Sequence, residues 1–108
     1  MEDRRAQLDS LIRDLGQLTE LLAFDPACQW RHHFLTCLRS AKELSHAAPT
    51  QQDLSSLSGS VMSVFGGMGS FNDYAPFRGG RVIAGMESLE DISGRVYESA
   101  LSLRVIES

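Results

Sequence analysis

The sequence predicts an all-α protein, a four-helix bundle-like single domain over residues 1–108 with a long ordered loop between the third and fourth helices. Apolar residues recur three and four positions apart in four separate stretches, as on one face of an amphipathic helix. Proline, glycine and capping residues separate these stretches. A chain of 108 residues is the size of one domain.

The first two helices are expected over residues 2–24 and 26–47. Asp25-Pro26 should end the first and start the second, because Asp is a good N-cap and Pro suits the first helical position. So short a link predicts an antiparallel hairpin. The apolar stripe of the first helix is Leu8, Leu11, Ile12, Leu15, Leu18 and Leu22, and that of the second is Ala27, Trp30, Phe34, Cys37, Leu38, Ala41 and Leu44.

The third helix is expected over residues 51–65, starting at a capping box made by Thr50 and Asp53. Its two faces differ. One carries Leu and Val, while the other carries small side chains and almost no charge. We expect this Ser/Gly face to be covered by another helix, by the following loop or by a partner; the alternative is an exposed serine-rich face. The face consists of Ser55, Ser56, Gly59, Ser60 and Ser63.

Residues 66–87 show no helical period and predict a long loop, which in a compact domain is usually functional or disordered. Large aromatic anchors in its first half favour an ordered loop. Residues 78–81, Arg-Gly-Gly-Arg, are expected to form a mobile tip, and residues 82–84 a short extended piece. The last helix is then expected over residues 89–106, with Ser88 as its cap and Asp91 three residues on.

The glycine stretch that opens this loop has two interpretations. Backbone N–H groups freed of side chains can cradle a phosphate, but a phosphate loop needs a following lysine and a helix N-terminus, and here the glycines follow a helix. The preferred interpretation is a structural corner, locked by the Asn72-Asp73 pair. The residues assigned to this corner are Gly66, Gly67, Met68, Gly69 and Phe71.

If the loop is a recognition site, polar and aromatic side chains just beyond the glycines should make the contacts. We therefore expect a partner-binding surface on the Asp73 to Arg81 side of the loop. Its candidate residues are Asn72, Asp73, Tyr74, Phe77, Arg78 and Arg81.

The sequence offers little for catalysis or for metal binding. No Gly-x-Ser-x-Gly motif and no plausible Ser, His and Asp set is present, so no enzyme is predicted. Cys28 and Cys37 are too far apart on one helix to pair, and no ligand spacing suggests zinc. His32 and His33 lie about 100° apart around a helix, so they are interpreted as surface histidines. No catalytic residue, metal or cofactor is expected.

Charge and hydropathy narrow the choice of partner. The net charge of −4 argues against a nucleic-acid binder. No apolar run approaches the roughly 18 residues of a membrane span, and no signal peptide is visible, so the expected compartment is the cytoplasm.

The block Val64-Phe65-Gly66-Gly67-Met68-Gly69-Ser70-Phe71-Asn72-Asp73 resembles a family of small bacterial all-helical proteins that carry a GGMGSFND motif. The resemblance extends to the order of the helices and to the Trp early in the second helix. It implies no biochemical activity. In size, acidity and lack of catalytic groups the chain is similar in type to the immunity proteins of bacterial toxin systems.

The expected function is therefore non-enzymatic protein binding, with a cognate toxin as the most concrete partner. Two alternatives remain open. One is a small-molecule or nucleotide-sensing module that uses the glycine turn. The other is a homodimeric structural protein that associates through the Ser/Gly face of the third helix.

Overall fold

A computed structural model describes residues 4–26, 28–47, 49–65, 74, 77–78 and 80–104, with the backbone alone at residues 4, 77 and 78. The described chain forms four helices, α1 (Arg4–Leu22), α2 (Trp30–Ser45), α3 (Gln51–Met62) and α4 (Leu89–Ser102). The strands β1 (Phe77–Arg78) and β2 (Arg81–Val82) form one small hairpin between α3 and α4. The all-α fold predicted from the sequence is confirmed.

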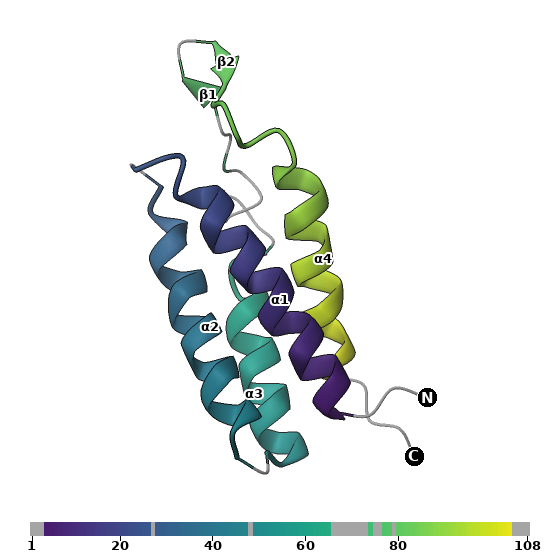
Figure 1. Cartoon of the computed structure of the whole chain (residues 1–108). Coiled ribbons are helices and arrows are strands. Elements are labelled where there is room, and N and C mark those ends of the chain that lie inside the picture. The colour runs from purple at the N-terminus through teal and green to yellow at the C-terminus, as the bar shows by residue number, and fades with distance from the viewer. Residues whose placement is uncertain are drawn as a thin grey trace.

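Helix α1 is the centre of the bundle. It packs against both α2 and α4, and α3 closes the other side by packing against the same two helices (Figure 1). The predicted stripe of α1 is the reason, because its leucines are buried in the core that the helices share. Five of them are at most 1% exposed: Leu8, Leu11, Leu15, Leu18 and Leu22.

The start of α2 differs from the prediction. Asp25 does not cap it; the helix begins at Trp30, after Gln29, which makes no side-chain cap. Residues 23–25 continue α1 as a tighter turn, and the Cys28 N–H then bonds to the Asp25 carbonyl at 3.0 Å. The Asp25 carboxylate accepts a hydrogen bond from the hydroxyl of Tyr74, far away in sequence.

The predicted cap residues of α3 and α4 are both found at the helix starts, but only the cap of α3 makes side-chain hydrogen bonds. The capping box of α3 is confirmed: the Thr50 N–H donates to Asp53 Oδ2 at 3.0 Å, and the Asp53 N–H donates to Thr50 Oγ1 at 3.1 Å. Ser88 does precede α4, but its side chain makes no cap hydrogen bond. Helices α3 and α4 are shorter than predicted, ending at Met62 and Ser102.

The serines of α3 divide between two environments. Ser58 is fully buried, and its hydroxyl donates to the Ala100 carbonyl of α4 at 2.6 Å. By contrast Ser56, Gly59, Ser60 and Ser63 are exposed, and a Cβ added at Gly59 would meet nothing within 4 Å. Within the described part of the chain another helix therefore does not cover these four residues, while Ser55 is half-buried. Residues 66–73 of the following loop lie outside the described residues, so coverage by that loop stays a prediction.

The loop between α3 and α4 ends in the β-hairpin. Phe77 pairs with Val82 and Arg78 pairs with Arg81, a strand pairing that the sequence did not predict. Gly80 has a φ of +81°, a backbone conformation that favours glycine. The hairpin projects beyond the end of the bundle where α1 ends and α4 begins (Figure 1). Among the described helices none has the length and apolar character needed to cross a membrane.

The two environments on α3 give a stability prediction. Ser58→Ala should lower the free energy of unfolding by about 1 kcal/mol, because the Ala100 carbonyl loses an interhelical hydrogen bond. The control is Ser56→Ala, an exposed serine of the same helix, which should change stability by less than ~0.5 kcal/mol. Urea unfolding followed by circular dichroism measures both. Equal effects of the two substitutions would contradict the assigned role of Ser58.

Candidate functional site

The structure describes only part of the partner-binding surface predicted from the sequence. Of its six candidates, Asn72 and Asp73 lie outside the described residues, and so do all five residues of the predicted glycine corner: Gly66, Gly67, Met68, Gly69 and Phe71. Phe77 and Arg78 form β1, and Arg81 is an exposed residue of β2. Tyr74 lies apart from the hairpin and packs against the core.

Tyr74 fastens the loop to the corner between α1 and α2. Its hydroxyl donates to Asp25 Oδ2 at 2.6 Å and lies 3.9 Å from the sulfur of Met86, a residue only 1% exposed. Burial, and next the hydrogen bond to Asp25, raise the pKa of the Tyr74 phenol well above its usual range. The contact fixes the loop against the bundle just before the hairpin.

A second contact supports the hairpin from its other side. The Phe24 ring lies directly over Gly85, where an added Cβ would come within 2.9 Å of three ring carbons. Gly85 also has a φ of +94°, so two constraints favour glycine there. Its N–H bonds to both Glu87 carboxylate oxygens at 3.1 and 3.2 Å. The chain returning from the hairpin is thus held on the end of α1.

These contacts leave apolar surface exposed at the end of the bundle. Phe24 is 56% exposed although it packs on Gly85, and Val82 is 41% exposed in β2. Arg81 stands next to Val82 and is also exposed. We call Phe24, Arg81 and Val82 the hairpin-end surface. It combines large apolar side chains with a cation, the composition found at the centres of protein interfaces.

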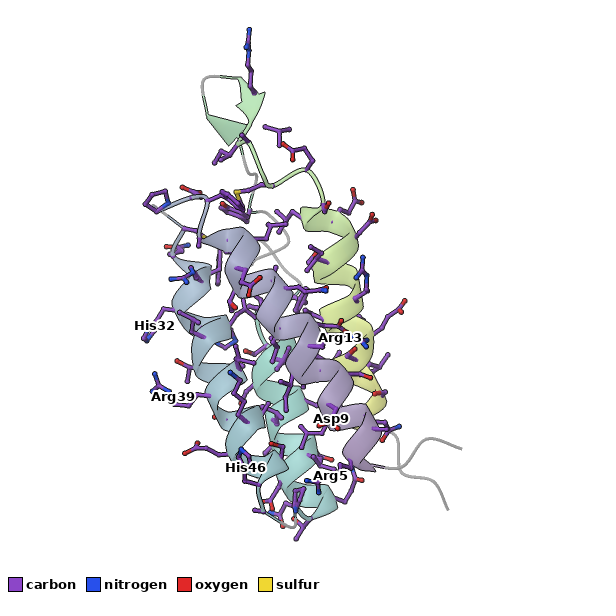
Figure 2. All side chains as sticks on the ribbon, in the orientation of Figure 1. Arg5, Asp9, Arg13, His32, Arg39 and His46 are labelled. Carbon is purple, nitrogen blue, oxygen red and sulfur yellow. The ribbon has the colours of Figure 1, made fainter. Side chains whose placement is uncertain are left out.

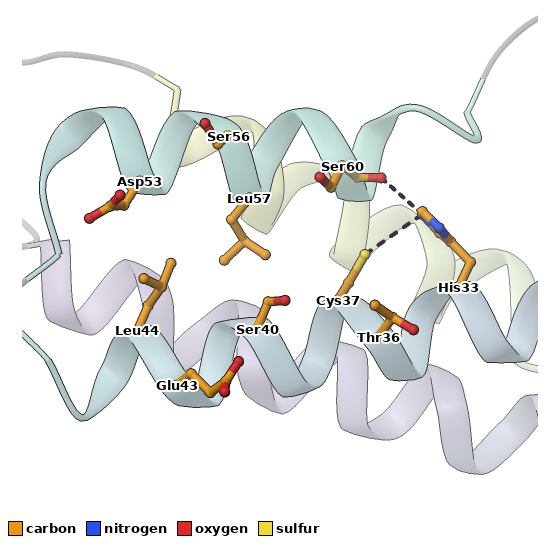
Figure 3. Close-up of a pocket in the computed structure, with 10 residues that line it drawn as sticks. All are labelled: His33, Thr36, Cys37, Ser40, Glu43, Leu44, Asp53, Ser56, Leu57 and Ser60. Carbon is orange, nitrogen blue, oxygen red and sulfur yellow. Dashed lines mark hydrogen bonds between the residues drawn. The ribbon is translucent and has the colours of Figure 1, made fainter.

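A hollow lies between α2 and α3, away from the hairpin-end surface, and we call it the α2–α3 groove. It has a volume of about 450 Å³. Apolar side chains line its interior, while hydroxyls, two carboxylates and an imidazole line its walls (Figure 3). The ten lining residues are His33, Thr36, Cys37, Ser40, Glu43, Leu44, Asp53, Ser56, Leu57 and Ser60.

The sequence did not predict this groove. The signal was present in the Ser/Gly face of the third helix, since Ser56 and Ser60 line the groove. That face alone does not predict a groove, because the opposite wall of the groove comes from α2. Which residues of α2 meet which residues of α3 depends on how the two helices pack, and helical period alone does not define that.

His33 has a more specific role than that of a surface histidine. Its Nε2 lies 2.9 Å from the Ser60 carbonyl oxygen and bridges α2 to α3. A carbonyl only accepts, so Nε2 must carry the proton. His32, in contrast, points away from the bundle, as does Arg39 of the same helix (Figure 2).

The His33–Cys37 pair is not arranged as a nucleophile and its base. The Cys37 sulfur lies 3.7 Å from His33 Nε2, the nitrogen whose proton faces Ser60, so that nitrogen cannot accept the thiol proton. Burial raises the pKa of the Cys37 thiol from 9.0 to about 11. A reactive cysteine needs a lowered pKa. Within the described ranges, no group of three or more His, Cys, Asp or Glu side chains could hold a metal ion.

The fold and these two surfaces define a small helical-bundle domain without a recognisable catalytic centre among its described residues. A family model described as a domain of unknown function, DUF6966, matches residues 25–84. The match covers more than half of the chain, so the chain belongs to the DUF6966 family. The matched segment contains α2, α3, the hairpin and all ten residues of the α2–α3 groove. No curated protein and no solved structure matches the chain.

The Tyr74–Asp25 contact gives a prediction for stability and its pH dependence. Tyr74→Phe should lower the free energy of unfolding at pH 7 by about 2 kcal/mol, because a buried carboxylate loses its donor. The pKa of Tyr74 is raised on folding, so its contribution is complete below the unfolded value near 10 and is lost above it. The difference in the free energy of unfolding between the wild type and Tyr74→Phe should therefore become smaller above about pH 10.

Urea unfolding across this pH range measures the effect. Tyr97→Phe is the matched control, since the Tyr97 ring is 38% exposed and its hydroxyl has no hydrogen-bond partner among the described residues. It should leave stability nearly unchanged. A Tyr74→Phe protein as stable as the control would rule out the anchoring role.

The geometry at Cys37 predicts a slow thiol. In a Cys28→Ala background at neutral pH, iodoacetamide should label Cys37 at least about a hundredfold more slowly than free cysteine, because a pKa two units higher leaves that much less thiolate. His33→Gln should not slow the labelling further. A substantially slower reaction in His33→Gln would mean that His33 activates the thiol, contrary to the assigned proton position.

Proposed function

We propose that this protein is a non-enzymatic protein-binding module, an immunity- or antitoxin-like protein that neutralises a bacterial toxin in the cytoplasm by binding it. The observation that carries the proposal is the hairpin-end surface. It is built on a projecting β-hairpin that belongs to the segment matched by the family. Phe24 and Val82 remain 56% and 41% exposed and would supply apolar contact area to a partner.

The way the hairpin is held supports the same proposal. Contacts at Tyr74 and at Gly85 fix both connections of the hairpin to the bundle. A surface that is already ordered loses less conformational entropy on binding, which favours tight complexes. Buried apolar anchors would then hold the partner.

The negative charge of this protein would mainly raise the rate at which it encounters a basic partner. The chain has a net charge of −4, and exposed acids on α4 include Glu90, Asp91 and Glu98. An acidic protein is attracted to a basic partner at long range, which raises the association rate more than the final affinity. A toxin that acts on nucleic acid or on another polyanion would carry such a basic surface.

The proposal predicts a complex with the product of the adjacent gene. Co-purification of the two proteins should give a stable complex, and Arg81→Asp or Val82→Asp should weaken it about tenfold or more, because both alter the contact surface. Thermal stability should stay close to that of the wild type, since both residues are exposed. Arg39→Asp, an exposed arginine of α2 far from the hairpin, is the charge-matched control.

Cell protection provides a second readout. Cells that express the adjacent product should survive with the wild type and with Arg39→Asp, and not with the hairpin variants. Absence of both a complex and protection would overturn the proposal. A complex unaffected by either hairpin substitution would keep the function but move the contact away from the hairpin-end surface.

A further inference from the structure

We propose that the α2–α3 groove receives an arginine or lysine side chain from an extended segment of a protein partner. This inference rests on the proposed function only in that the occupant is a protein. It uses a surface separate from the hairpin, and it remains testable if the hairpin contact fails.

The charge of the groove is the first argument. Among its ten lining residues there are two carboxylates, Glu43 and Asp53, and no lysine or arginine. The two acids come from opposite walls, Glu43 from α2 and Asp53 from α3, toward the same end of the groove (Figure 3). A cation placed between them would interact with both.

The negative charge of Glu43 is not balanced in the described structure. Glu43 lies in the last turn of α2, where the helix dipole disfavours an acid. Its neighbours Arg39 and Lys42 line, together with it, another hollow along α2, yet neither forms an ion pair with it. A bound cation would offset this unfavourable charge.

Asp53 also keeps one free oxygen. Its Oδ2 accepts the Thr50 N–H in the capping box, while Oδ1 has no partner among the described residues. The capping bond fixes the orientation of the carboxylate, so Oδ1 is positioned without the loss of further side-chain freedom. A guanidinium that donates to Oδ1 would pair with Asp53, and Glu43 on the opposite wall would add attraction at longer range.

The rest of the groove suits the stem of such a side chain. Leu44, Leu57 and Cys37 provide apolar surface for the methylene groups, as long cationic side chains prefer. The hydroxyls of Ser40, Ser56 and Ser60 offer hydrogen bonds to a backbone that lies above the stem. The volume of about 450 Å³ lies within the range of ligand sites.

The small size of these wall residues explains why a chain segment, rather than a free cation, is the expected occupant. Ser56 and Ser60 lie beside Gly59, whose Cβ position is open, so another backbone can approach α3 closely. A single solvated charge pair contributes only up to about 1 kcal/mol, which is too little to retain a small cation. Backbone contacts along the Ser/Gly face would supply the rest of the binding free energy.

The experiment titrates the ¹⁵N-labelled protein with a short blocked peptide of alternating arginine, glycine and serine. The matched peptide has citrulline, a neutral isostere, in place of arginine. Amide shifts should concentrate on residues 33–44 and 53–60 with the arginine peptide and be absent with the citrulline peptide. Binding should weaken as sodium chloride is raised toward 1 M, where the screening length is about 3 Å.

Three variants test the location. Glu43→Gln should weaken peptide binding about three- to fivefold, as expected for one partly solvated charge pair. Glu98→Gln removes an equally exposed and unpaired carboxylate from α4 and should have no effect. Ser56→Arg places a cation inside the groove from α3 and should abolish peptide binding while the circular dichroism spectrum stays unchanged.

Several outcomes would overturn the inference. One is a set of shifts outside the groove, and another is equal binding of the two peptides. Spermidine binding as tightly as the arginine peptide would replace the protein segment by a free cation. A solution mass that doubles with concentration and returns to the monomer value in Ser56→Arg would assign the groove to a second copy of this chain. Loss of the toxin complex in hairpin variants alone would leave the groove inference intact.

Discussion

The burial of the leucine row of α1 is the constraint on which the rest of the structure depends. Five leucines that recur every three or four residues are almost completely removed from water, and each contributes about 2 kcal/mol of transfer free energy when fully buried. One neighbour cannot cover a stripe that wide, so α2 and α4 both pack against α1. Helix α3 then fills the remaining side, and its Ser58 hydroxyl donates a hydrogen bond to the Ala100 carbonyl of α4.

This arrangement leaves the two candidate surfaces at different places and for different reasons. The hairpin-end surface exists because the chain between α3 and α4 is longer than a direct connection requires, and the excess is folded into β1 and β2. Tyr74, Met86 and Gly85 hold that excess against the end of α1. The α2–α3 groove exists because small side chains line this part of the seam, so the two helices do not fill it.

The chemistry of the two surfaces also differs. Apolar side chains and a cation are exposed at the hairpin end, whereas unbalanced carboxylates lie in the groove. One partner could therefore contact the protein through two unlike surfaces, which would add specificity to its recognition.

Polar residues show where local rules stop being sufficient. Thr50 and Asp53 satisfy each other over three residues, and this short range made the capping box predictable. Asp25 precedes a proline and looks like a cap in the sequence, but its carboxylate bonds to Tyr74, 49 residues away. His33 and Ser58 bond to carbonyls 27 and 42 residues away. None of these three partners has a local signature.

The sequence by itself determined the all-α class, the number and approximate positions of the helices, the apolar stripe of α1 and the capping box of α3. Each follows from interactions within a few residues or from a helical period. The tertiary structure alone decided that Asp25 anchors Tyr74, that Ser58 is buried while Ser56 is exposed, and that Glu43 and Asp53 line one groove from opposite walls. These features depend on the rotation and spacing of whole helices, which long-range packing sets and which no local pattern records.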